Sequence, residues 1–250
     1  MEIVLVASLY DAEAICNALM AQTQMIAMDI EGVDLNRGGD IALLQIATNE
    51  KKVFCFDILE LGVDVFSFAY LGQVLESDRI SKLCYDCRID ADVLLDKFGI
   101  KLQMVYDLQV LYTFAFQSAQ DPFLKGMHHA LQKPGILNKK KSSDKKMLVC
   151  KKDIKALLQS SPDSSKKLFM QRPISEKVLF YCISDVVYLF RMYRLWSALI
   201  PSSVVRQASM YRMHKYCYRM NRAINAAHTK RMARIDFKRM PVTYCCSLAG

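Results

Sequence analysis

The sequence predicts an α/β domain built on a mixed sheet, and the order of its apolar segments carries that prediction. Three segments, at about 25–31, 40–48 and 51–57, follow one another with only turns between them, which is typical of a meander of adjacent strands. A strand at about 80–86, a helix at about 88–98 and a short strand at about 103–109 come next. The remainder has helical periodicity, and this succession predicts helices packed around the sheet.

Each element has its own local signal. A strand at about 2–7 opens the chain, and Ser8 is the expected N-cap of a helix over about 10–22. A helical stretch covers 66–76, and Gly99 is placed to end the helix that starts near residue 88. Residues 133–147, "KPGILNKKKSSDKKM", are polar, basic and interrupted by Pro134 and Gly135, so we expect a mobile surface loop there.

Two long helices are expected after that loop. The first covers 175–198, with Ser175 as its N-cap, and the second covers about 202–234 and carries most of the remaining basic residues. We therefore expect one domain over residues 1–200 and a basic helical extension over 201–250, packed on the domain or trailing from it.

Composition and charge narrow the class of protein. The 250 residues are 52% hydrophobic and carry a net charge of +9, with no apolar run of membrane-spanning length and no signal-peptide pattern. Nine cysteines, an odd number at irregular spacing, fit a reduced intracellular protein, nuclear or cytoplasmic and not secreted. Cys84 and Cys87 form a C-x-x-C without a second pair to complete a zinc site, so we expect the cysteines to fill the core.

The charge is distributed unevenly along the chain. Residues 1–120 carry −10, whereas residues 121–170 carry +8 and residues 201–250 carry +9. This pattern indicates a carboxylate-rich, metal-binding half flanked by surfaces for a polyanion, although charge runs are also common as solvated faces.

Acidic residues stand at three places where chemistry would need them. In "MIAMDIEGVD", Asp29 and Glu31 share one face of a strand, and two like charges side by side suit a bound cation unless they merely point into water. Asp90 follows the fourth strand of the α/β unit, in the first turns of a helix. Tyr181 and Asp185 are four residues apart on a predicted helix whose face is otherwise apolar, where a carboxylate needs a partner.

These stretches carry a family resemblance. "MDIEG", "YDCRIDADVLL" and "RPISEKVLFYCISDVVYLF" resemble the three motifs of the RNase D-like 3′–5′ exonucleases, the DEDD superfamily in its variant with a tyrosine, over about residues 20–198. "DLQ" at 107–109 is similar to a structural Asp of that family, and the segment after Glu31 is most similar to its eukaryotic exonuclease-domain proteins. The resemblance implies a ribonuclease H-like fold with a sheet of five or six strands.

The resemblance also implies the roles of the site residues. Asp29, Glu31, Asp90 and Asp185 would hold two Mg²⁺ or Mn²⁺ ions, and the Tyr181 hydroxyl would orient the attacking water. Asp86 and Asp92, which lie close to Asp90, are expected to be local caps or surface charges.

The function expected from this resemblance is metal-dependent 3′–5′ hydrolysis of single-stranded RNA. An inactive exonuclease-fold scaffold that binds RNA and a DNA exonuclease are the alternatives, and the sequence is silent on the natural substrate, protein partners and oligomeric state. After Glu31, Gly32 either allows close backbone approach to the terminal nucleotide or simply ends the strand, and two basic segments are the other expected nucleic-acid contacts. The expected contact residues are Gly32, Val33, Lys139, Lys140, Lys141, Arg212, Lys215 and Arg219.

Overall fold

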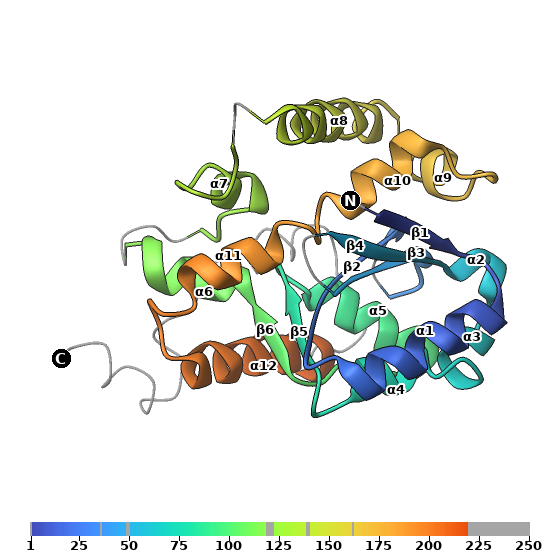
Figure 1. Cartoon of the computed structure of the whole chain (residues 1–250), viewed down its shortest axis with the longest axis horizontal. Coiled ribbons are helices and arrows are strands. Elements are labelled where there is room, and N and C mark those ends of the chain that lie inside the picture. Colours follow the sequence, from blue (N-terminus) through green and yellow to red (C-terminus); the bar gives the residue numbers. More distant parts are fainter. Residues whose placement is uncertain are drawn as a thin grey trace.

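A mixed six-stranded sheet forms the centre of the computed structural model, which describes residues 2–35, 37–48, 51–118, 123–138, 141–161 and 163–219 (Figure 1). The strand order is β1-β4-β3-β2-β5-β6. The bounds are β1 (Glu2–Val6), β2 (Met25–Val33), β3 (Asp40–Ala47), β4 (Lys52–Asp57), β5 (Ser81–Cys84) and β6 (Val105–Asp107). Strand β3 is antiparallel to both β2 and β4, whereas the β1–β4, β2–β5 and β5–β6 pairs are parallel. The predicted meander and the mixed α/β sheet are confirmed.

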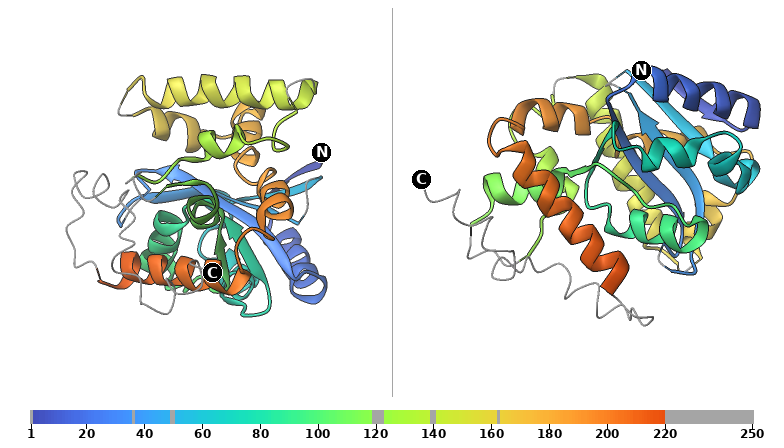
Figure 2. Two further views of the ribbon diagram at one scale, coloured as in Figure 1. Left: turned by 90° about the vertical axis from the view of Figure 1, so that its left-hand side faces the viewer. Right: turned by 90° about the horizontal axis from the view of Figure 1, so that it is seen from below.

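Helices cover both faces of this sheet, as the two views of Figure 2 show. One face carries the helices that precede β6 in the chain, together with the last helix of the chain. Those that precede β6 are α1 (Leu9–Gln22), α2 (Ile58–Leu61), α3 (Asp64–Ser67), α4 (Leu71–Glu76) and α5 (Arg88–Phe98). Those that follow β6 are α6 (Leu108–Phe116), α7 (Met127–Leu131), α8 (Ser142–Leu158), α9 (Ser164–Phe169), α10 (Glu176–Ile183), α11 (Leu189–Trp196) and α12 (Ser202–Arg219). Helices α8, α9 and α10 lie on the opposite face from α1 and α5.

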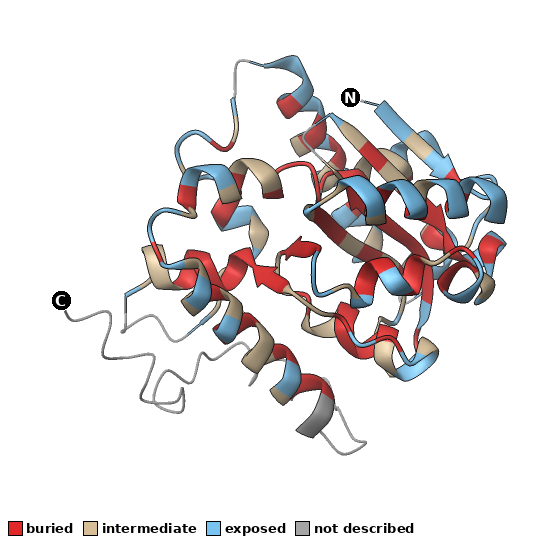
Figure 3. Ribbon diagram, turned by 60° about the horizontal axis from the view of Figure 1, so that its bottom comes forward, coloured by how far each residue is buried: buried red, intermediate tan, exposed pale blue. Residues whose placement is uncertain are grey.

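The alternation of side chains along β2 divides the core from the site. Ile26, Met28 and Ile30 belong to the apolar cluster beneath α1, α4 and α5, where they are almost completely buried. Asp29 and Glu31 therefore point to the other face, toward α9 and α10. Figure 3 shows the buried residues concentrated along the strands and the inward sides of the helices. One strand thus supplies both the packing surface and two carboxylates.

Several predicted helix ends are confirmed by their hydrogen bonds. The Ser8 side chain accepts a hydrogen bond from the Asp11 amide at 3.1 Å, and that of Ser175 accepts one from the Val178 amide at 3.3 Å. Gly99 ends α5 with a φ of +68°, in the left-handed region that favours glycine. No helix within the described ranges is both long enough and apolar enough to cross a membrane.

Residues 133–147 are only partly a loop, so that prediction was wrong for its second half. Helix α8 begins at Ser142, because Met147, Cys150 and Ile154 provide a buried stripe at helical spacing that lies mostly beyond this basic segment. Asp144 is also buried, and its carboxylate accepts a hydrogen bond from the Asn138 amide at 2.8 Å. The helical stretch at 66–76 is likewise divided into α3 and α4, since Tyr70 adopts a φ of +62° between them.

The single helix predicted over 175–198 was also wrong. The chain forms α10 and α11 with a tight turn over 184–188 between them. In that turn the amides of Asp185 and Val186 bond to carbonyls only three residues back, those of Cys182 and Ile183, at 3.3 and 3.2 Å. Helix α12 covers the first part of the last predicted helix, and residues 220–234 of that prediction lie outside the described residues.

Helix α12 packs along the β6 end of the sheet, against α5, β6 and α6. Val205 and Ala208 are buried with the residues of α6 and α11, and Tyr216 and Cys217 are buried with those of α5. The described part of the C-terminal region is therefore joined to the same core as the sheet. The division of the chain at residue 200 stays a prediction.

Candidate active site

Three carboxylates from two parts of the chain meet on the face of β2 that packs toward α9 and α10. One carboxylate oxygen from each of Asp29, Glu31 and Asp185 can be chosen so that all three atoms lie within 4.8 Å of one another. Asp29 and Glu31 are adjacent because residues two apart on a strand share a face. Asp185 reaches them from the turn between α10 and α11, so the break in the predicted helix carries this side chain to the sheet.

The electrostatics of this group favour a bound cation. Burial raises the pKa of Asp29 well above its ordinary value, and the charges of Asp90, Asp185 and Glu31 raise it further. Burial, followed by the charge of Asp185, does the same to the pKa of Glu31. Carboxylate oxygens are the hard ligands that Mg²⁺ and Mn²⁺ prefer. The donor set therefore fits the divalent cations that the sequence led us to expect.

Asp90 lies beside this group rather than within it. Its side chain is 9% exposed in the first turn of α5, and burial, followed by the charges of Asp86, Asp107 and Asp185, raises its pKa to about 8. Its charge acts on both Asp29 and Glu31. Asp90 thus adds a fourth carboxyl group at the edge of the cluster.

The two other acids near Asp90 are paired with arginines. Asp92 is 1% exposed and its carboxylate lies 2.9 Å from the guanidinium of Arg37. Asp86 pairs with Arg88 and, at 3.0 Å, with Arg212. Both carboxylates thus have arginine partners within the protein. Asp92 is buried, so it is not one of the surface charges that the sequence analysis allowed.

Tyr181 projects from α10 beside the carboxylates. Burial and the charges of Glu31, Asp185 and Asp29 all raise the pKa of its hydroxyl. In the metal-free protein the group is therefore a neutral phenol, which can donate and accept hydrogen bonds. Its ring packs 6.4 Å from that of Phe169, centroid to centroid.

A lysine that the sequence analysis did not single out completes the site. The ammonium of Lys151, on α8, forms an ion pair with the carboxylate of Asp185, and its Nζ lies 5.9 Å from the centroid of the Tyr181 ring. The side chain is 20% exposed. No signal in the sequence marks this lysine, because it reaches the site only through the packing of α8 against α10.

The comparison with protein families decides the family of the chain. A family described as "3'-5' exonuclease" matches residues 3–199. The chain belongs to this exonuclease family. The resemblance on which Asp29, Glu31, Asp90, Tyr181 and Asp185 were selected is thereby confirmed at the level of the family and its fold.

Curated relatives and solved structures agree with this membership. The chain is 30% identical over 165 residues to piRNA biogenesis protein EXD1 of Mus musculus and of Homo sapiens, an alignment that covers 66% of the chain but only 28% and 30% of those proteins. RNase D of Trypanosoma brucei has the same fold, with a TM-score of 0.70 at 23% identity over 90% of this chain and 76% of that one. Escherichia coli RNase D gives a TM-score of 0.65 at 18% identity, covering 90% and 52%.

The basic residues expected to contact nucleic acid have different surroundings in this exonuclease fold. Lys141 is exposed just before α8, whereas Lys139 and Lys140 lie outside the described residues. The guanidinium of Arg212 faces inward, 3.2 Å from the carboxylate of Asp107 and 2.8 Å from the amide oxygen of Gln109. Lys215 is half-buried on the same helix. The side chain of Arg219, the last residue of α12, is not among those described.

Packing already requires a glycine at position 32. A β-bulge between Glu31 and Gly32 shifts the β2–β3 register, and a Cβ added at Gly32 would lie 1.9 Å from the backbone oxygen of Asp40. The adjacent Val33 is half-buried and pairs with Asp40 at the end of β2. The strand-exit explanation is thus sufficient for this glycine, and contact with a nucleotide at these two residues stays a prediction.

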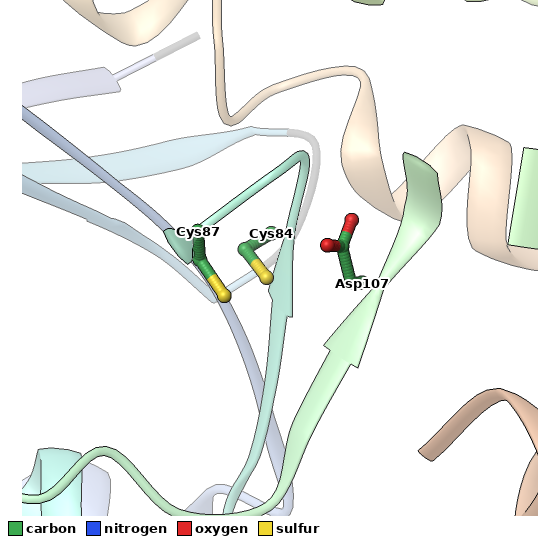
Figure 4. A group of neighbouring side chains, drawn as sticks. All are labelled: Cys84, Cys87 and Asp107. Atoms are coloured by element: carbon green, nitrogen blue, oxygen red, sulfur yellow. The ribbon is translucent and has the colours of Figure 1, made fainter. Parts of the chain in front are cut away.

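A second group of potential ligands lies at the ends of β5 and β6. Figure 4 shows Cys84, Cys87 and Asp107 side by side, and one ligand atom from each lies within 4.8 Å of the others. Asp107, however, accepts hydrogen bonds from the amides of Asp86 and Gln109 at 2.9 and 2.8 Å, besides its contact with Arg212. Burial raises the pKa of Cys84 well above that of an ordinary thiol. Cys84 and Cys87 therefore fill the core, as do the other cysteines among the described residues, and Asp107 acts as the expected structural acid.

Proposed function

We propose that this chain is a metal-dependent 3′–5′ exonuclease that hydrolyses single-stranded RNA from its 3′ end. The observation that carries the proposal is the meeting of Asp29, Glu31 and Asp185 within 4.8 Å, on a fold that belongs to an exonuclease family. In support, T. brucei RNase D, with a TM-score of 0.71 to this chain, has been solved in complex with RNA U12.

The residues have separate tasks in the proposed reaction. Asp29, Glu31 and Asp185 would hold one Mg²⁺ or Mn²⁺ ion, and Asp29 together with Asp90 would hold a second. Bound cations would activate the attacking water and stabilise the charge that develops on the phosphate. The neutral Tyr181 hydroxyl orients the water toward the terminal phosphorus. The new P–O bond forms as the bond to the 3′ oxygen breaks, and that oxygen takes up the proton, so a nucleoside 5′-monophosphate is released.

A basic surface is needed because the carboxylates repel a polyanion in the absence of cations. Exposed lysines lie at the start of α8, the helix that covers the site. They are Lys141, Lys145 and Lys146. Phosphates of the RNA strand upstream of the terminal linkage would follow these side chains, and Lys139 and Lys140 belong to the same basic segment of the sequence.

The test is a cleavage assay on 5′-labelled 12-nucleotide RNA and DNA of the same sequence, with Mg²⁺, Mn²⁺ or EDTA. We expect a ladder that shortens from the 3′ end of the RNA with either cation, no cleavage with EDTA, and none from the Asp29→Asn variant. Cleavage of DNA alone would overturn the choice of substrate. RNA binding without cleavage under every condition would identify an inactive exonuclease fold that acts as a scaffold.

A further inference from the structure

Lys151 poses a problem for the proposed reaction because its ammonium pairs with the carboxylate of Asp185, which a divalent cation would also need. It pairs with an oxygen of Asp185, one of the three residues whose ligand atoms meet within 4.8 Å. Its charge also acts on the pKa values of Asp29 and Glu31, where it is the cationic influence that opposes burial and the neighbouring carboxylates. In this structure Lys151 is the counter-charge of the acidic cluster.

The backbone that carries Lys151 is anchored independently of this ion pair. Cys150 and Ile154 are buried against α9 and α10, and the Cys150 thiol donates to the carbonyl of Lys177 at 3.4 Å. On the outer side of α8, Asp153 pairs with Lys177 at 2.9 Å. The lysine side chain, in contrast, ends in a point charge on a four-carbon stem with many rotamers. The ammonium can therefore leave Asp185 while α8 stays in place.

Divalent cations would compete with the ammonium for Asp185, since both are attracted to the same oxygens. Once cations neutralise the carboxylates, the ammonium loses its partner but stays close to the Tyr181 ring, at the place where the proposed function puts the reacting phosphate. A phosphate oxygen of the substrate would then offer the ammonium an acceptor, since lysine is a common point-charge ligand of phosphate.

We propose that Lys151 exchanges partners during the catalytic cycle: it neutralises Asp185 in the metal-free protein and binds the terminal phosphate when cations occupy the carboxylates. This inference rests on the proposed function and adds a catalytic residue to it. The other explanation is a purely structural ion pair between α8 and the α10–α11 turn.

The variants that test the inference are Lys151→Met, Lys151→Arg and Lys152→Met. Methionine keeps most of the apolar stem and removes the charge, and arginine keeps the charge. Lys152 is the matched control, because it is the next residue of α8 and its side chain is exposed. Urea unfolding in EDTA shows that each variant is folded before any binding is measured.

The first measurement is the titration of Mn²⁺ by calorimetry in the absence of nucleic acid. Removing a competing cation should tighten binding to Lys151→Met by about threefold to tenfold, while Lys151→Arg and Lys152→Met should match the wild type. Unchanged Mn²⁺ affinity in Lys151→Met would overturn the competition, and with it the inference.

The second measurement is the binding of uridine 5′-monophosphate at saturating Mn²⁺, which presents the phosphate that the proposed reaction releases. Loss of a charged hydrogen bond to phosphate should weaken binding to Lys151→Met by about tenfold or more, with recovery in Lys151→Arg. Equal affinity in all four proteins would overturn the phosphate contact.

The two proposals fail in different ways. If the wild type cleaves RNA and Lys151→Met matches it in both titrations and in rate, the partner exchange is wrong and the proposed function stands. If no protein cleaves nucleic acid but both titrations shift as expected, the partner exchange is right for metal and phosphate binding, whereas the proposed function and the catalytic role of Lys151 are wrong.

Discussion

Replacing Asp90 by asparagine should make the metal-free protein less sensitive to pH. Burial and three neighbouring carboxylates raise the pKa of Asp90 to about 8, from an ordinary value of 3.8. Between about pH 4 and about pH 8 Asp90 is ionised in the unfolded chain but still protonated in the folded protein. The unfolding free energy of the wild type therefore falls as pH rises through this range. Between pH 5 and pH 8 this loss amounts to about 4 kcal/mol as an upper limit. The asparagine side chain does not titrate, so the variant lacks this contribution.

The assay is urea unfolding followed by circular dichroism at pH 5, 6, 7 and 8, in EDTA. The difference in unfolding free energy between variant and wild type should increase steadily with pH, in favour of the variant. The control is Asp96→Asn, an exposed aspartate on the same helix, whose difference from the wild type should stay nearly constant. Addition of Mn²⁺ at pH 8 should stabilise the wild type more than Asp90→Asn.

A pH-independent difference between Asp90→Asn and the wild type would refute the reasoning. Such a result would mean that Asp90 is solvated or has a cationic partner in the folded protein, and that it is not held in a cluster of like charges.

Three further predictions concern the rate, the substrate track and the fold. Tyr181→Phe should lower the single-turnover rate of RNA cleavage by about 10²–10⁴-fold with unchanged RNA affinity, because only the hydroxyl that orients the water is removed; a decrease below about threefold would remove Tyr181 from the mechanism. Changing Lys139, Lys140 and Lys141 together to alanine should flatten the dependence of log RNA affinity on log salt, by about 0.7 for each phosphate that these lysines neutralise. A slope equal to that of the wild type would exclude this segment from RNA binding. Gln45→Met should raise the unfolding free energy in EDTA by about 1 kcal/mol, because Gln45 is completely buried across from Asp29 and neither amide atom has a hydrogen-bond partner among the described residues. Destabilisation by this last change, measured in urea, would show that the amide is satisfied in solution.

The sequence was most informative where a short-range pattern determines the structure. Alternation along β2 put Asp29 and Glu31 on one face. Ser8 and Ser175 begin their helices and Gly99 ends its helix, as their residue types favour. The meander and the mixed sheet followed from such local patterns, whereas the family followed from the resemblance of three motifs to known exonucleases.

What escaped prediction depends on contacts between distant segments. Lys151 enters the site because α8 packs on α10, and a run of lysines gave no sign of that packing. The continuous helix over 175–198 was expected because Tyr181 and Asp185 have the right spacing, yet the backbone turns at Asp185 to bring its carboxylate to β2. Arg212 was assigned to RNA from charge alone, and only tertiary structure reveals its carboxylate partners.

The inward-facing guanidinium of Arg212 also bears on where the chain can be cut. It joins three residues of the β5–β6 edge to a helix more than 90 positions later in the chain, and the backbone amide of Asp107 donates to Ser209 on that same helix at 2.9 Å. A fragment that stops at residue 200 would leave Asp86 and Asp107 as neighbouring negative charges with no compensating guanidinium from α12, and it would expose the apolar surface that Tyr216 and Cys217 cover. The described part of the predicted basic extension thus holds together the chain at the ends of β5 and β6, close to Asp90. We therefore expect the shortest fragment able to fold to extend beyond Cys217.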